Sequence, residues 1–245
     1  MRVVVISDIH ANYDALKAIV KETEALKPDR YVCLGDVVGY YAEPQECVDL
    51  VREMDMMCIQ GNHDGVAGGG EEPVDFNPVA TEAILWTRQA LDDDARRWLA
   101  NLPTQGKITP QIWIVHGSLR DRDEYILSRM AVESNFRLMR SLVEPRVVLF
   151  GHTHRRAVYR SVHGGNGIAL CGFEDKLDTR DGGRYLINPG GSGQPRDGVP
   201  GAPYAIIDEA IIEFRRALYD VEAAAAKVAA LSFGEPLADR LVRGM

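Results

Sequence analysis

The sequence predicts an α/β fold that begins with a parallel sheet, and two observations lead to this prediction. Within the first 60 residues, β-branched apolar runs alternate with amphipathic helical patterns in the order strand, helix, strand, helix, strand, which is typical of parallel strands joined by right-handed crossovers. The chain has 245 residues, 46% of them hydrophobic and 26% charged. These are ordinary globular values and enough chain for one sizeable core, so we expect a single domain over residues 1–245.

The first elements follow from this alternation. We expect strands at residues 2–7, 31–34 and 56–60. A helix that carries Leu16 and Ile19 on its apolar face precedes Pro28, which ends it. A second helix begins at Pro44, a residue suited to a first helical turn. The three strands are therefore expected to lie side by side, with a helix in each connection.

The rest of the chain is predicted from shorter patterns. Helical periodicity covers residues 76–91, 95–102 and 128–142, and apolar runs predict strands at 112–115 and 147–150. After Gly151, short strands are expected at 157–162, 167–171, 185–188, 204–207 and 211–215, the last two as a hairpin. The Ala-rich tail from Asp220 onward reads as helical. We find no internal repeat and no linker that would divide the chain.

Composition excludes several classes of protein. The net charge of −8 leaves no basic excess to displace counterions from nucleic acid, so we expect no stable nucleic-acid binding. The apolar run at residues 3–6 is far shorter than a signal-peptide core or a membrane span. The four cysteines include no C-x-x-C pair and are expected to be buried thiols in a reducing compartment. We therefore expect a soluble, cytoplasmic protein with no membrane partner.

Chemistry-bearing residues gather at the ends of the predicted strands. Five of the six histidines fall in four short segments that each follow a strand, and Gly35-Asp36 has the same form without a histidine. Ligands of open α/β sheets bind outside the carboxyl ends of the strands. One crevice should therefore collect Asp8, His10, Asp36, Asn62, His63, His116, His152 and His154.

Imidazoles, carboxylates and one amide together describe a metal site. The set contains no thiolate, which suits Mn, Fe, Zn, Ni or Co. It has too many ligands for one ion, and Asp36 could bridge two ions about 3.5–4 Å apart. Each segment alone has a plainer explanation: a capped turn at Asp8, a turn with positive φ near Asn62, a core histidine at His116. The combination at successive strand ends favours the metal site.

The motifs D-x-H, G-D, G-N-H-[DE], H and G-H-x-H stand here as Asp8–His10, Gly35-Asp36, Gly61–Asp64, His116 and Gly151–His154. They resemble those of the calcineurin-like metallophosphoesterase superfamily. Gly-Asp-Val-Val-Gly-Tyr at 35–40, Asn-Pro-Gly at 188–190, Gly-Gln-Pro-Arg at 193–196 and Tyr-Asp-Val at 219–221 look like its small bacterial and archaeal phosphoesterases. The resemblance implies a four-layer α/β/β/α sandwich with a parallel-rich first sheet, a mixed second sheet, a helical insertion at about 76–102 and a helical tail at about 220–245.

The resemblance also implies roles for individual residues. Asp8, His10 and His154 would hold one metal ion, Asn62, His116 and His152 a second, and Asp36 would bridge them. His63 would contact the phosphoryl group and protonate the leaving alkoxide, and Asp64 would orient the ring of His63. The implied function is hydrolysis of P–O bonds in small, nucleotide-like phosphodiesters or phosphomonoesters by a metal-bridging hydroxide. We expect phosphodiesters to be favoured and Mn to be the metal, with Fe, Zn, Ni or Co as alternatives.

Departures from the family pattern reduce the range of expected substrates. Protein phosphatases and symmetrical dinucleoside tetraphosphatases of the superfamily read G-D-x-V-D-R-G, and residues 35–41 lack that arginine, which makes both activities less favoured. Arg196 could grip a phosphate oxygen instead, or it could be a surface turn residue. Tyr40 and Tyr41 could wall the substrate site or serve packing. A catalytically silent protein-binding module of the same fold is the alternative function, and a homo-oligomer is compatible with the tail.

Overall fold

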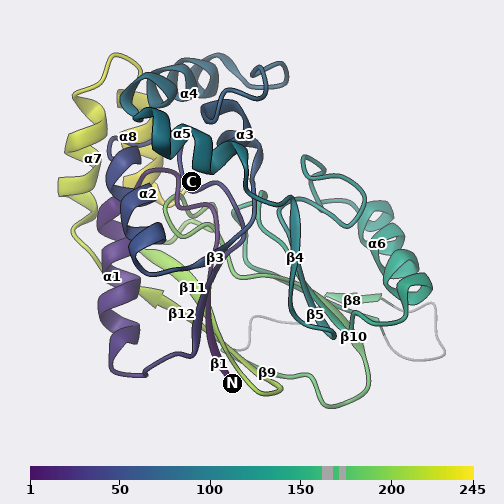
Figure 1. The fold of residues 1–245 in the computed structure, drawn as a ribbon. Helices are drawn as coiled ribbons and strands as arrows, with labels where there is room; N and C mark the ends of the chain where they lie inside the picture. Colours follow the sequence, from purple (N-terminus) through teal and green to yellow (C-terminus); the bar gives the residue numbers. More distant parts are fainter. Residues whose placement is uncertain (162–167, 171–174) are drawn as a thin grey trace.

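The computed structural model describes residues 1–161, 168–170 and 175–245. Its strands form two six-stranded sheets that pack face to face (Figure 1). The first sheet has the order β3 (Met57–Cys58), β2 (Arg30–Cys33), β1 (Arg2–Ile6), β11 (Ala202–Asp208), β12 (Ile211–Ala217) and β9 (Lys176–Asp178). The second has the order β4 (Gln105–Thr109), β5 (Ile112–Val115), β6 (Val147–Leu149), β10 (Arg184–Asn188), β7 (Ala157–Ser161) and β8 (Ile168–Leu170).

Both sheets are mixed. Strands β1, β2 and β3 are parallel, as the sequence predicts, whereas β11 pairs with β1 antiparallel and continues into β12 and β9. The parallel part of the first sheet is therefore its N-terminal half only, because the C-terminal hairpin β11–β12 joins the open edge of β1. In the second sheet, β5, β6 and β10 are parallel and the outer strands antiparallel.

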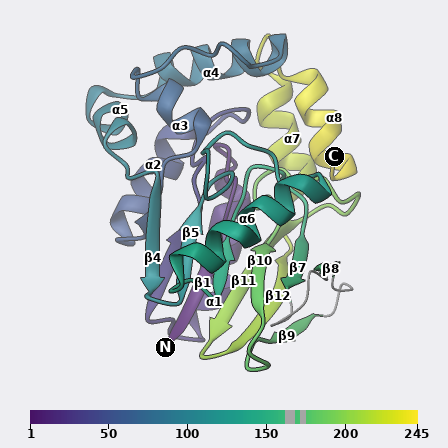
Figure 2. The same cartoon turned by 90° about the vertical axis from the view of Figure 1, so that its right-hand side faces the viewer.

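Alternation along β1 produces the layers. Val3 and Val5 face the second sheet and contribute to the apolar core between the sheets. Val4 and Ile6 face the opposite way, toward α1 (Tyr13–Glu24) and α2 (Pro44–Glu53). Helix α6 (Arg129–Leu142) covers the outer face of the second sheet (Figure 2). The order of layers is therefore helix, sheet, sheet, helix, as the resemblance implies.

The remaining helices lie at the end of the molecule where β1 and β2 finish (Figure 1). They are α3 (Asn62–Ala67), α4 (Pro78–Ala90), α5 (Asp93–Ala100), α7 (Val221–Ala229) and α8 (Glu235–Arg243). The expected helices within 76–102 are α4 and α5, and the expected helical tail is α7 and α8. Helices α4, α7 and α8 pack around a further apolar cluster that includes Phe233, Leu237 and Leu241. None of the helices that the structure describes is both long and apolar enough to cross a membrane.

Some expected elements differ from the observed ones. The strand expected at 56–60 is shortened to β3. Residues 59–61 lead from β3 into α3, whose first residue is the predicted ligand Asn62. The edge strands β4 and β9 were not predicted. Val162, Gly167 and Cys171, the outer limits of two expected strands, lie outside the described residues. The remaining three cysteines are buried free thiols, as expected.

Candidate metal centre

The carboxyl ends of β1, β2, β5 and β6 bring the predicted ligands to one place between the two sheets. Asp8 and His10 follow β1, Asp36 follows β2, His116 follows β5, and His152 and His154 follow β6. All six side chains are buried. Their ligand atoms form two groups that are compact enough to hold a metal ion: Asp8, His10 and His154, and Asp36, His116 and His152. Each of these two groups takes side chains from both sheets. A third group of the same kind combines His10 and Asp36 with His63.

The backbone at these positions is unusual. Asp8, His10, Asp36, His152 and His154 all have φ between +51° and +62°, the left-handed region that residues other than glycine rarely enter. Such conformations cost about 1–3 kcal/mol each and cluster at functional sites, where the surrounding structure holds them. Here they let the chain turn sharply after each strand while the side chain still points into the space between the sheets.

Backbone carbonyls fix the orientation of three imidazoles. Nδ1 of His10 donates to Val38 O (3.2 Å), Nδ1 of His116 to Leu34 O (2.8 Å), and Nδ1 of His154 to Gln194 O (2.8 Å). A proton on Nδ1 leaves Nε2 with a free lone pair directed inward, which is the arrangement found in metal-ligating histidines.

The inward-facing atoms fit a cation. Nε2 of His10 and Nε2 of His154 lie 3.1 Å apart, and with both protons on Nδ1 neither nitrogen can donate to the other. Asp36 Oδ2 lies 3.6 Å from His10 Nε2 and 3.3 Å from His116 Nε2, so one carboxylate faces both groups. Two facing lone pairs beside a buried carboxylate are compensated when a metal ion lies among them.

Further contacts complete the two groups. Asp8 Oδ1 lies 3.5 Å from His154 Nε2, and Asn62 Oδ1 lies 3.2 Å from His116 Nε2. His152 differs from the other histidines, because its Nε2 donates to the carbonyl of Asp123 at 3.0 Å. Its Nδ1 is then the nitrogen left for a metal. The donor set of imidazole, carboxylate and amide oxygen therefore fits the two ions that the sequence predicts.

The pKa values divide these histidines into two kinds: His10 and His154 are neutral, whereas His116 is protonated beside Asp36. Burial lowers the pKa of His10 and His154 well below the usual value, so both are neutral and able to coordinate a metal. Burial also acts on His116, but the Asp36 carboxylate outweighs it and raises the pKa of His116 to about 10. His116 in turn helps to hold the pKa of Asp36 well below its usual range against the opposing effect of burial. A proton on His116 and a metal ion would thus neutralise the same carboxylate.

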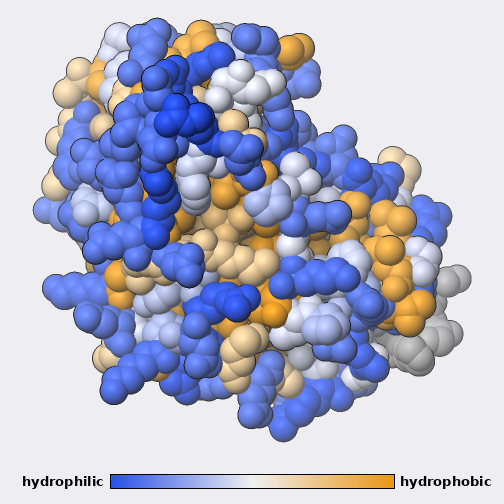
Figure 3. Space-filling view, in the orientation of Figure 1, coloured by the Kyte–Doolittle hydropathy of each residue, from blue (hydrophilic) through white to orange (hydrophobic). Residues whose placement is uncertain are grey.

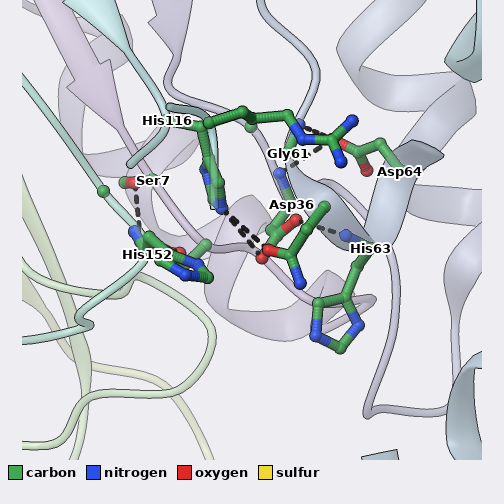
Figure 4. Close-up of polar contacts among 12 residues, drawn as sticks. Ser7, Asp36, Gly61, His63, Asp64, His116 and His152 are labelled. Carbon is green, nitrogen blue, oxygen red and sulfur yellow. Dashed lines mark hydrogen bonds and ion pairs between the residues drawn. The ribbon is translucent and has the colours of Figure 1, made fainter. Parts of the chain in front are cut away.

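His63 is near this centre, but Asp64 does not orient its ring. The Asp64 carboxylate accepts four backbone N–H groups, from Asp36 (2.8 Å), Gly61 (2.9 Å), Val37 (2.9 Å) and Val38 (3.3 Å). In Figure 4 it points toward Gly61, away from the His63 ring. Nδ1 of His63 has no hydrogen-bond partner among the described residues. The predicted role of Asp64 is therefore wrong: it joins the loop after β2 to the start of α3.

A cavity of about 330 Å³ adjoins the centre. Asn62, His63 and His152 line its inner side, with Tyr40, Val66, Ala80 and the residues Glu71, Glu72, Val74, Asp75, Phe76, Asn77, Asp123 and Tyr125 around them. Figure 3 shows this face hollowed between the part of the molecule that carries α3–α5 and the part that carries α6, with hydrophilic residues on both sides. This volume is at the small end of ligand sites.

Two of the three predicted substrate residues are close to this region. Tyr40 lines the cavity, with its ring centroid 4.6 Å from that of His63. Arg196 is half-buried, and its backbone N–H donates to His154 O at 3.2 Å. Tyr41 does not fit the prediction. Its ring is buried in the cluster with α7 and α8, its hydroxyl accepts from Gln194 Nε2 (3.1 Å), and it is not part of the cavity wall.

Sequence reasoning missed the residues that support His152. Tyr125 stacks on the His152 ring with centroids 3.9 Å apart, and Asp123 supplies the carbonyl described above. Next to them, Arg122 forms a two-pronged pair with Glu71 (2.7 and 2.6 Å), and it also donates to Gln60 (2.9 Å) and Asp123 (2.7 Å). Arg122 thereby joins the loop after β5 to the loop after α3. An arginine inside the loop after His116 was the available signal.

Comparison with known proteins gives the family. The family model described as the calcineurin-like phosphoesterase superfamily domain matches residues 1–210. The chain belongs to this superfamily. An uncharacterized protein of Methanocaldococcus jannaschii is 34% identical over 261 aligned positions, which cover 99% of this chain and 98% of that protein.

Solved structures agree with this membership. A metallophosphoesterase from Sphaerobacter thermophilus is 35% identical, with a TM-score of 0.85 over 100% of this chain and 99% of that one. A hypothetical protein from Pyrococcus horikoshii is 20% identical, with a TM-score of 0.80 over 100% and 98%, which shows a shared fold. The protein is therefore a metallophosphoesterase whose buried histidines and aspartates are consistent with a dinuclear metal site.

Proposed function

We propose that this metallophosphoesterase hydrolyses small phosphodiesters or phosphomonoesters with two divalent ions, and that diesters are its better substrates. The observation that carries the proposal is the position of Asp36, whose Oδ2 faces a histidine of each ligand group. Two ions held there would lower the pKa of a bound water to supply the nucleophile and would stabilise charge on the phosphoryl oxygens. We propose Mn as the metal, with Fe, Zn, Ni or Co as alternatives, since a ligand set without thiolate suits all of them.

The protein's own residues would then hold and protonate the ester. His63 lies in the cavity wall beside the ligand groups, where it can give a proton to the departing alkoxide. Burial lowers the pKa of His63 to about 4, so the ring would have to gain its proton when substrate binds, and a phosphoryl anion next to the ring favours this protonated form. Arg196 would contact a non-bridging oxygen of the phosphoryl group. Its positive charge is close enough to lower the pKa of His10, His63 and His154. Tyr40 would form part of the wall.

The small cavity and the complete ligand set favour an enzyme over a binding module. A module that had abandoned catalysis would have no reason to keep six buried ligands and an opening beside them. The same features support a small phosphorylated compound as substrate. The sequence from 35 to 41, which lacks the family arginine, supports neither a protein phosphatase nor a dinucleoside polyphosphate hydrolase.

The decisive test is hydrolysis of bis-p-nitrophenyl phosphate and p-nitrophenyl phosphate by one preparation, with Mn²⁺ and with EDTA. We expect turnover that EDTA removes and Mn²⁺ restores, with the diester cleaved faster. His63→Ala should reduce turnover by roughly 10²–10⁴ and leave metal content unchanged. Absence of turnover with Mn²⁺, Ni²⁺, Co²⁺ or Zn²⁺ would contradict the proposal and favour the binding module.

A further inference from the structure

The wall of the cavity is acidic, which is unexpected beside a phosphate-binding centre. Four carboxylates line it, from Glu71, Glu72, Asp75 and Asp123. Among the residues that the structure describes, no lysine or arginine belongs to this wall. Arg196 acts electrostatically on Tyr40, His63 and Tyr125 in this wall, whereas Glu72 and Asp75 have no ion pair among the described residues. Any part of a substrate that extends from the metal ions to Glu72 and Asp75 therefore meets negative potential. A second phosphate in that position would be repelled.

The four carboxylates fall into two pairs. Arg122 binds Glu71 and Asp123, so its single positive charge is shared between these two carboxylates and offsets part of their negative charge. Glu72 and Asp75 are exposed and have no hydrogen bond or ion pair to their carboxylates within residues 1–161, 168–170 and 175–245. They lie in the segment between α3 and α4, which also supplies Val74 and Phe76 to the wall. These two are the charges free to act on a ligand.

Aromatic rings and an unpaired histidine mark the same space as a ligand site. The ring centroids of Phe76 and Tyr40 lie 4.5 and 4.6 Å from that of His63, and Tyr125 is also part of the wall. His63 is 4% exposed and lines the cavity, and its Nδ1 has no hydrogen-bond partner in the described part of the chain. Carboxylates combined with aromatic faces are the surroundings that proteins use to bind organic cations.

We propose that the enzyme prefers phosphoesters with a positively charged arm, a quaternary or primary ammonium, that lies in the cavity between Glu72, Asp75 and Phe76. This inference rests on the proposed phosphoesterase function. The arm takes no part in the reaction: the oxygen of water bonds to phosphorus, the ester P–O bond breaks, and the leaving oxygen takes up a proton. The site would thus recognise an ester that is anionic at one end and cationic at the other.

The experiment compares two substrates that differ only in the charge of the arm. p-Nitrophenylphosphorylcholine carries a trimethylammonium group, and p-nitrophenyl 3,3-dimethylbutyl phosphate is its neutral carbon analogue. Both release the same p-nitrophenolate, so the chemical step is matched. One cation–aromatic contact and two exposed charge pairs predict a kcat/KM about five- to thirty-fold higher for the choline ester. Raising the salt concentration should reduce this ratio.

Substitutions of Glu72 and Asp75 test whether these carboxylates cause the preference for the choline ester. Glu72→Gln and Asp75→Asn should each reduce the ratio about two- to five-fold and leave hydrolysis of the neutral ester unchanged, since neither residue belongs to the catalytic machinery. Glu24→Gln, which removes the same charge from an exposed position at the end of α1, should leave the ratio unchanged. Because all three positions are exposed, the variants should fold like the parent protein.

The outcomes separate this inference from the proposed function. Equal kcat/KM for the two esters, or a ratio that Glu72→Gln and Asp75→Asn do not change, would overturn the inference while the phosphoesterase stands. Hydrolysis of bis-p-nitrophenyl phosphate alone, with both of the matched esters inert, would overturn it as well. Absence of turnover with every ester would contradict the phosphoesterase function itself.

Discussion

Asp64→Asn tests whether this carboxylate serves the structure of the loops or the chemistry of His63. In the structure, each Asp64 oxygen accepts two backbone N–H groups. Asparagine keeps one oxygen and presents an NH₂ group in place of the other, which faces N–H donors that it cannot accept from. Burial and the neighbouring Asp36 carboxylate raise the pKa of Asp64 to about 7, so above that pH two hydrogen bonds to a buried charged group are lost.

The expected loss is large. Each hydrogen bond to a charged group contributes about 1.5–3 kcal/mol, so Asp64→Asn should lower the free energy of unfolding by about 3–6 kcal/mol. Urea-induced unfolding, followed by circular dichroism, measures this change. Asp92→Asn is a matched control, because Asp92 accepts the N–H of Ala95 at the start of α5 (2.7 Å) and asparagine serves equally well there.

The two interpretations of Asp64 predict opposite results. If Asp64→Asn stays within about 1 kcal/mol of the parent protein, and its turnover falls by the same factor as that of His63→Ala, the carboxylate acts through His63. The reasoning from its four backbone partners would then be wrong.

Three further changes test the centre. Asp36→Asn should abolish activity and reduce bound metal from two ions to one or none per chain, and two retained ions in a metal analysis would refute the bridging role. Gly39→Ala should reduce kcat by about 10² or more with metal content unchanged, because Gly39 has φ +98° and a Cβ there would collide with the His63 ring; normal kcat would show that the ring can move. Arg122→Ala should weaken metal binding about 10–100-fold by releasing the loop that holds His152, and Arg122→Lys should not restore it, since lysine lacks the planar fork. Unchanged affinity in a metal titration would argue against this link.

The sequence was sufficient to predict the elements that carry strong apolar patterns. Strands β1, β5 and β6 are apolar runs rich in β-branched residues, and β2 ends in the buried residues Val32 and Cys33. Each of the four was expected within one residue of its observed limits. Strand β4 was missed because Gln105–Thr109 is an edge strand of polar and small residues with one buried side chain, which gives no alternation to detect. Strand β9 has only three residues and an exposed pattern.

In the candidate site, too, some features could be predicted from the sequence and others could not. Ligand positions could be predicted because each follows a strand, and strand ends share one edge. The direction of a side chain could not be predicted in this way, so the expectations for Asp64 and Tyr41 failed. Asp64 turns to Gly61 and to three consecutive N–H groups that lie 26–28 positions away, and Tyr41 turns toward Gln194, 153 positions away. The distant partners come close only when the chain has folded.

Each of the two ligand groups combines residues from both sheets, and this determines when during folding a metal ion can bind. Asp8, His10 and Asp36 come from the first sheet, and His116, His152 and His154 from the second. The first ligand group cannot assemble until the chain has been synthesised through His154, and the second until it has been synthesised through His152; both also require the two sheets to dock. Tight metal uptake would therefore be a late event in folding, and binding of both proposed ions would require that the two halves of the molecule have reached their final arrangement.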